Sequence, residues 1–176
     1  MTPAANPGAE QARPDRSKMH FFGLADAPEL IDTDMMEPVV IPDGIIGAVD
    51  LGAGPSGTRV RILLRQAGDD GFSLVSAWYG PGFRLPRHSH SVDCTYYVTK
   101  GQIRLGNRCI GEGAGFFIPA GHPYAFRVDE DGPAELLEFR HGTQFDIRYL
   151  DDLDALRAIA ASAAEREPVW AQVRPA

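Results

Sequence analysis

Apolar and polar side chains alternate along the middle of this chain with the two-residue period of β-strands. Each alternating stretch is short and is bounded by Gly, Pro or Asp, residues that favour tight turns. Many short strands at even spacing predict an all-β barrel or sandwich. The stretches are residues 45–51, 58–65, 72–79, 102–106, 108–113, 115–119, 124–128 and 134–140.

The two ends of the chain have other patterns. Residues 1–18 are rich in Ala, Pro and charge, so we expect a disordered arm there. Residues 19–45 are irregular and are expected to form a strand and loop that cap the barrel or a partner subunit. Residues 46–149 then make up the barrel, and residues 150–168 are expected to form one helix on its outside.

That C-terminal segment carries apolar side chains at helical spacing, and either Asp151 or Asp152 is placed to cap its start. Pro168 is expected beyond its end, because proline does not continue a helix. The apolar positions are Leu150, Leu153, Leu156, Ile159, Ala160 and Ala163.

Length and composition set broad limits on the protein. A chain of 176 residues with 44% hydrophobic content fits a single domain, and a net charge of −7 argues against nucleic acid as a partner. No apolar run approaches the roughly 20 residues that span a bilayer, so no membrane partner is expected, and the N-terminus lacks the apolar segment of a secretory signal. With only Cys94 and Cys109, no disulfide framework is implied, and we expect a cytoplasmic protein.

Two histidines one residue apart suggest a site of chemistry. His88 and His90 stand in the stretch GFRLPRHSHSVDCTYYVTKG, and on a strand both project from the same face. A metal site is commonly built in this way. A second stretch, GAGFFIPAGHPYAF, places a proline and glycine turn between two apolar runs.

The first of these stretches resembles the first motif of the cupin family, which reads glycine, HxH, glutamate and glycine at set spacings. Gly82, His88, His90 and Gly101 match it, whereas Cys94 stands at the glutamate position.

The second stretch resembles the second cupin motif. Gly113, Pro119 and Gly121 match, but Tyr124 stands at the histidine position and Val128 at the asparagine position. The resemblance implies a single-domain antiparallel β-barrel, or jelly roll, and a homodimer. It also implies an enzyme that acts on a small organic molecule, of the dioxygenase or of the isomerase and lyase kind.

Side-chain parity predicts which residues meet inside such a barrel. Tyr124 and Phe126 lie on the more apolar face of their strand, and Cys94 and Tyr96 share the face of the histidines if register holds. In residues 134–141, Leu137, Phe139 and His141 alternate with Leu136, Glu138 and Arg140, and the first set, which is the more apolar, is expected to point inward. The resulting candidates are His88, His90 and Cys94 as metal ligands, Tyr124 and His141 as catalytic residues, and Tyr96, Phe126 and Phe139 as substrate pocket.

The chemistry of this set leaves alternatives open. Two imidazoles with a thiol suit a divalent transition metal, namely Fe, Ni, Zn, Cu or Mn, and the sequence does not decide the ion or whether one is bound. A metal-free isomerase or cyclase with histidine and tyrosine as acid and base is a second interpretation. A third is a non-catalytic protein that binds a small molecule, in which the absence of the motif glutamate and of the second-motif histidine marks a loss of chemistry.

Overall fold

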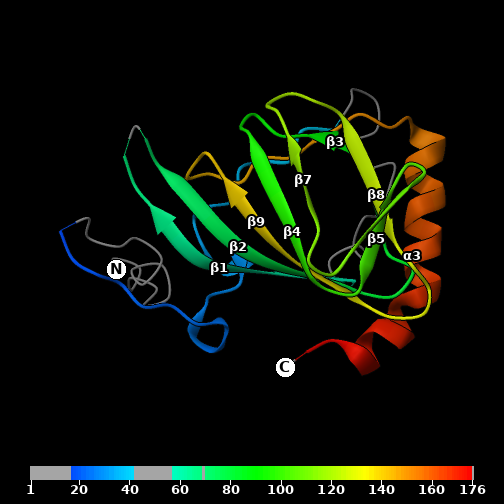
Figure 1. The fold of residues 1–176 in the computed structure, drawn as a ribbon. Coiled ribbons are helices and arrows are strands. Elements are labelled where there is room, and N and C mark those ends of the chain that lie inside the picture. Colours follow the sequence, from blue (N-terminus) through cyan, green and yellow to red (C-terminus); the bar gives the residue numbers. More distant parts are fainter. Residues whose placement is uncertain (1–16, 42–56, 69, 176) are drawn as a thin grey trace, which may run out of the picture.

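The computed structural model describes residues 17–41, 57–68 and 70–175, and it consists mainly of antiparallel strands (Figure 1). The predicted strand at 45–51 and residues 1–16 of the predicted arm lie outside the described residues. The strands are β1 (Thr58–Gln66), β2 (Phe72–Tyr79), β3 (Arg84–Ser89), β4 (Cys94–Lys100), β5 (Gln102–Leu105), β6 (Arg108–Gly111), β7 (Gly115–Ile118), β8 (Tyr124–Val128), β9 (Ala134–Arg140) and β10 (Arg148–Tyr149).

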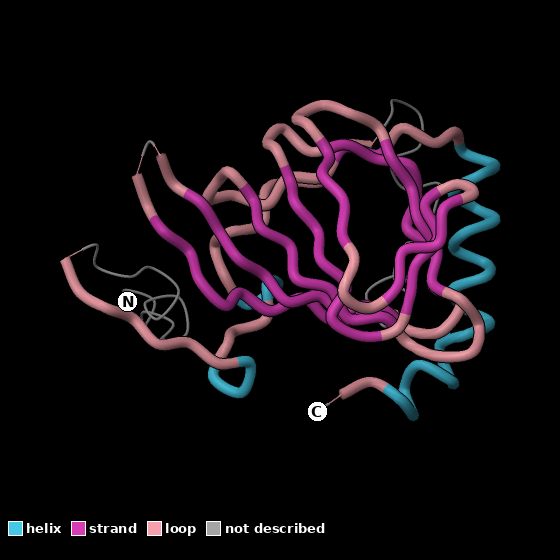
Figure 2. The backbone as a smooth tube through the Cα atoms, viewed as in Figure 1, coloured by secondary structure: helices cyan, strands magenta, loops and turns pink. Residues whose placement is uncertain are grey.

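Two five-stranded sheets make up the barrel. One has the order β1-β2-β9-β4-β7 and the other β10-β3-β8-β5-β6. Figure 2 shows the strands of both sheets curving around a shared interior, with the C-terminal helix outside. The expected antiparallel all-β barrel with one C-terminal helix is therefore confirmed.

The N-terminal segment lies against the first sheet. It contains two short 3-10 helices, η1 (Leu24–Asp26) and η2 (Leu30–Asp32). Leu30 and Met35 are buried together with Ile62 of β1. The peptide N–H of Phe145 donates to the carbonyl of Met35 at 2.7 Å, so this segment covers one side of the barrel interior.

Helix α3 (Leu153–Val173) lies along the outside of the second sheet (Figure 1). Asp152 caps it, because its side chain accepts a hydrogen bond from the N–H of Ala155 at 2.9 Å. The helix continues through Pro168, so the prediction that it ends before this residue was wrong. Trp170 gives the reason. It is 1% exposed and its Nε1 donates to the carbonyl of Pro81 at 2.9 Å, and this packing offsets the roughly 3 kcal/mol that a proline costs inside a helix.

On β4 and β8 the buried side chains alternate as predicted. Tyr124 and Phe126 of β8 and Tyr96 of β4 are buried, as expected. On β9 the prediction was wrong, since Glu138 and Arg140 point inward while the neighbouring positions do not. Register decides this: Glu138 lies opposite Tyr96 and Arg140 opposite Cys94, on the face that β4 turns to the interior.

The turn glycines of the two motifs have a common backbone conformation. Gly82, Gly101, Gly113 and Gly121 all have positive φ, between 68° and 82°. Only glycine adopts this region at little cost, so the glycine spacing of the motifs records where the chain must turn.

Candidate active site

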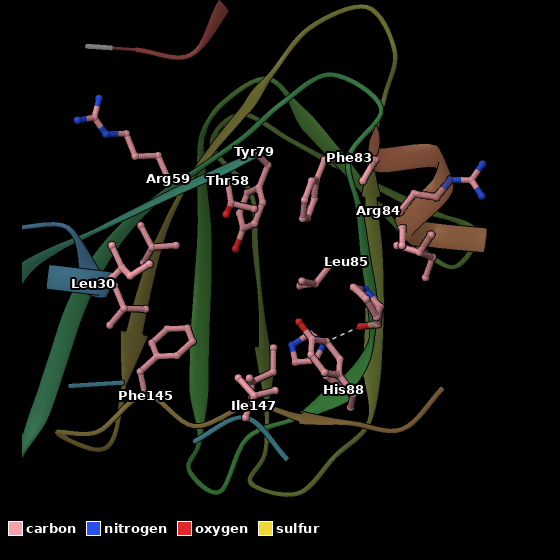
Figure 3. Close-up of a pocket in the computed structure, with 18 of the residues that line it drawn as sticks. Leu30, Thr58, Arg59, Tyr79, Phe83, Arg84, Leu85, His88, Phe145 and Ile147 are labelled. Carbon is pink, nitrogen blue, oxygen red and sulfur yellow. Dashed lines mark hydrogen bonds between the residues drawn. The ribbon is translucent and has the colours of Figure 1, made fainter. Parts of the chain in front are cut away.

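A chamber of about 870 Å³ with mainly apolar walls opens inside the barrel and extends to the N-terminal segment and helix α3. Figure 3 shows Leu30, Phe145 and Ile147 around it. The polar side chains that line its inner part come from β3 and the residue that follows it, and from β4, β8 and β9. They are His88, His90, Tyr96, Tyr124 and Glu138.

His88 lines the chamber and has an unprotonated ring nitrogen, Nε2. Its Nδ1 lies 2.8 Å from the carbonyl of Pro86, and because a carbonyl only accepts, Nδ1 carries the proton. Within the described part of the chain, Nε2 has no hydrogen-bond partner. Burial, and then the neighbouring ring of His90, lower the pKa of His88 to about 4, so the imidazole is neutral at pH 7.

His90 is held by bonds on both ring nitrogens. Its Nδ1 donates to the carbonyl of Asp146 at 2.5 Å, and its Nε2 lies 3.0 Å from the hydroxyl of Tyr124. Burial lowers the pKa of His90, and the charge of Glu138 opposes this effect. His90 is therefore neutral at pH 7, and its Nε2 is the acceptor for Tyr124.

Tyr124 begins a chain of hydrogen bonds that ends at a carboxylate. Its hydroxyl lies 2.5 Å from that of Tyr96, and Tyr96 donates to Oε1 of Glu138 at 3.0 Å. Burial, and then the charge of Glu138, raise the pKa of both phenols. Both hydroxyls therefore keep their protons at neutral pH.

This chain of hydrogen bonds has three contacts but only two protons to share among them. Three contacts join His90, Tyr124, Tyr96 and Glu138, yet the two hydroxyls supply two protons. A proton added to Nε2 of His90 satisfies all three, because His90 then donates to Tyr124, Tyr124 to Tyr96 and Tyr96 to Glu138. The chain of hydrogen bonds is thus arranged to accept a proton at Nε2 of His90.

The carboxylate at the end of the chain is ionised by its neighbours. Nη1 of Arg140 donates to Glu138 at 2.6 Å and Nη2 donates to Asp146 at 3.2 Å. Burial by itself would raise the pKa of Glu138, but the guanidinium outweighs it and the pKa is lowered. The arginine also stacks on the ring of Phe145 at 4.2 Å.

A group of possible metal donors lies in the same place. Donor atoms of His90, Cys94 and Glu138 are all within 4.8 Å of one another, a spacing that one metal ion can bridge. However, Nη1 of Arg140 contacts both Sγ of Cys94, at 3.5 Å, and Glu138. Burial also raises the pKa of the Cys94 thiol and keeps it protonated. A guanidinium therefore occupies the place of the cation, and the group fits a metal poorly in this arrangement.

The structure brings most of the predicted site residues together and separates three of them. His88, His90, Cys94, Tyr96 and Tyr124 are buried side by side. The others are Phe126, which packs edge-on against Tyr79 in the core, Phe139, which packs at a tilt against Phe72 on the outer face of β9, and His141, which is exposed. The expected inward position of Phe139 and His141 was wrong, because Glu138 and Arg140 take that face.

Sequence reasoning therefore missed Glu138 and Arg140. The rule that the more apolar set faces inward failed because these two charges neutralise each other inside the barrel. A signal was present in the i, i+2 spacing of the acid and the base, which puts both on one face of a strand.

Comparisons with solved structures agree with this fold. No protein-family model and no curated protein matches the sequence. An RmlC-like cupin protein from Ralstonia eutropha JMP134 is 13% identical, with a TM-score of 0.53 over 86% of this chain and 88% of that one. The polyketide cyclase RemF from Streptomyces resistomycificus is 22% identical, with a TM-score of 0.48 over 57% of this chain and 76% of that one. KdgF from Halomonas sp. is 15% identical, with a TM-score of 0.47 over 71% of this chain and 96% of that one.

The chain therefore has the cupin fold that its paired motifs predict. Among the described residues, no helix is long and apolar enough to cross a membrane.

Proposed function

We propose that this protein is an enzyme that moves a proton within a small, mainly apolar organic molecule without the help of a metal. An isomerisation, a cyclisation or a lyase reaction would each use such a step. The observation that carries the proposal is the chain from His90 through Tyr124 and Tyr96 to Glu138, which is one proton short and lies in the wall of the chamber.

The proton path follows from the contacts. The oxygen of Tyr124 takes a proton from the bound molecule while its own proton passes to Nε2 of His90, 3.0 Å away. The imidazolium is stabilised by the nearby negative charge of Glu138, which opposes the effect of burial. Reversal of the path returns a proton to a different atom of the bound molecule, so the protein ends in its starting state.

His88 has a separate role in this scheme. Its neutral Nε2 is an acceptor next to Tyr124, with ring centroids 4.3 Å apart. It would accept a hydrogen bond from a hydroxyl or from an acidic C–H of the bound molecule and turn the reacting atom toward Tyr124.

Proton exchange in a carbon acid, a molecule with an acidic C–H bond, tests this function. We would follow deuterium exchange into the α-position of 2-tetralone, a bicyclic ketone, by proton NMR in D2O. The wild-type protein is expected to accelerate exchange, and Tyr124→Phe to lower the protein-dependent rate by about 10², the usual size of an acid–base contribution. Exchange at the buffer rate, or an equal rate in Tyr124→Phe, would overturn the proposal. Tight binding of 2-tetralone without exchange would favour the non-catalytic binding protein.

A metal-dependent enzyme of the dioxygenase or of the isomerase and lyase kind is the second candidate. The donor spacing of His90, Cys94 and Glu138 favours it, and the contacts of Arg140 oppose it. Elemental analysis for Fe, Ni, Zn, Cu and Mn, beside a His88→Ala/His90→Ala variant, separates the two. Near-stoichiometric metal that is lost in the variant, with exchange abolished by a chelator, would replace the first proposal by the second.

A homodimer and a cytoplasmic location also stay predictions. Exposed apolar side chains on the N-terminal segment support a dimer, since Met19, Phe21 and Ile31 are all more than three-quarters exposed. Sedimentation velocity of the full chain tests the dimer, and cell fractionation tests the location.

A further inference from the structure

Tyr79 is a buried phenol at the end of β2 whose hydroxyl makes no hydrogen bond to any residue that the structure describes. It is the last residue of β2 and is 7% exposed. Its ring packs against Phe83, at 5.4 Å between centroids, and against Phe126 at 5.1 Å. Within the described part of the chain, its hydroxyl makes no hydrogen bond, although a buried tyrosine hydroxyl usually finds one.

The hydroxyl of Tyr79 points into the chamber. Figure 3 shows its ring beside Phe83, with the oxygen directed toward the open space. Burial, and then the charge of Glu138, raise the pKa of Tyr79, so it offers a proton to any acceptor that enters. The group is therefore a hydrogen-bond donor directed into the chamber.

The chamber separates this donor from the reacting groups. In Figure 3, Tyr79 and Phe83 lie toward one end of the chamber and His88 and Ile147 toward the other. Leu85 lies between them. A molecule that reaches both ends must be elongated and apolar in its middle.

The wall chemistry restricts the ligand further. Aromatic rings are frequent in the wall, which favours a flat aromatic body. The arginines that line the chamber are turned elsewhere or are paired with acids. Figure 3 shows Arg59 and Arg84 directed away from the chamber, and Arg59 pairs with Glu29, Arg166 with Glu130 and Arg174 with Glu29. The acceptor that meets Tyr79 is therefore a neutral oxygen rather than a carboxylate.

We propose that Tyr79 is a substrate-binding residue that donates a hydrogen bond to a neutral acceptor oxygen at the far end of a flat, largely aromatic molecule. The opposite end of this molecule meets His88 and Tyr124. This assignment of the two ends rests on the proposed function, whereas the bond to Tyr79 does not.

Two neutral fluorescent probes test the proposal by binding alone. 6-Propionyl-2-dimethylaminonaphthalene carries a carbonyl acceptor, and N-phenyl-1-naphthylamine has no oxygen. Tyr79→Phe removes only the hydroxyl and keeps the ring in its packing. It is expected to raise the Kd of the carbonyl probe about three- to tenfold, as the loss of one hydrogen bond should, and to leave the Kd of the other probe within about twofold.

Tyr97→Phe is the matched control, because Tyr97 is half exposed on β4 and does not line the chamber. Circular dichroism of each variant establishes that the fold is retained. An equal change for both probes, no change for either, or no binding of the carbonyl probe to the wild-type protein would overturn the proposal. Failure of 2-tetralone exchange with the probe result intact would overturn the proposed function and leave Tyr79 as a ligand-binding residue.

Discussion

The guanidinium of Arg140 donates to the carboxylate of Glu138 at 2.6 Å inside the barrel, where the two side chains are 0% and 3% exposed. They stand two residues apart on β9 and share its inward face. The pair brings an ionised carboxylate to the end of the tyrosine chain and places a positive charge among the possible metal donors. It therefore determines which chemistry the chamber supports.

Loss of Arg140 should be strongly destabilising. Arg140→Met leaves Glu138 and Asp146 buried without their shared cation, and such a change typically costs about 3–5 kcal/mol in the free energy of unfolding. Urea unfolding measures it. Arg148→Met is the control, since Arg148 is mostly exposed and lies 3.8 Å from Asp146, and its cost should stay below about 1 kcal/mol. Similar costs for the two variants would contradict the role given to Arg140.

Stability should fall on mild acidification. His88 stays neutral in the folded protein down to a pKa of about 4, whereas in the unfolded chain it protonates near its ordinary value of 6.5. Between these values the unfolded chain binds more protons, so the free energy of unfolding should drop by roughly 3 kcal/mol as the pH falls from about 6.5 to about 4. The lowered pKa of His90 acts in the same direction.

Urea unfolding at several pH values between 4 and 7.5 measures this dependence. His88→Gln removes the titrating group, so its stability should decline less steeply over the same range. A variant that keeps the full wild-type slope would show that the neutral form of His88 is not what the fold requires.

Tyr96 should be necessary for the proton path, although it does not touch the bound molecule in the proposed scheme. Tyr96→Phe breaks the link between Tyr124 and Glu138 and removes a donor from a buried carboxylate, at a cost of about 1–3 kcal/mol. The rate of 2-tetralone exchange should fall at least tenfold and its pH profile should shift, because His90 loses its connection to the negative charge. Tyr97→Phe, on the opposite face of β4, should change neither quantity. An unchanged pH profile in Tyr96→Phe would indicate a purely structural role.

The contact between helix α3 and the barrel should depend on a glycine. A Cβ at Gly80 would collide with the indole ring of Trp170, whose Nε1 bonds the neighbouring Pro81. Gly80→Ala should therefore lower Tm by several degrees through overpacking. Gly132→Ala should leave Tm nearly unchanged, because apart from its two chain neighbours no described residue comes within 4 Å of the added carbon. Thermal unfolding followed by circular dichroism compares the two.

Much of the fold could be predicted from local patterns. Two-residue alternation marked β1, β2 and β5 to β9, and positive φ at the motif glycines explains why their spacing, together with that of the motif histidines and proline, indicated a cupin barrel. The HxH pair placed His88 and His90 together because side chains two apart on a strand share a face. At Pro168 the local pattern predicted the wrong helix end, because the contact of Trp170 with the barrel stabilises the turns beyond the proline.

The chain by itself determined the barrel, its turns and the inward direction of His88, His90, Tyr96 and Tyr124, since these follow from backbone periodicity and from residues with few allowed conformations. Only the tertiary structure decided that Glu138 and its arginine partner point inward. Burial of a charge depends on partners brought close by strand pairing and by the loop that carries Asp146, and no local pattern records them.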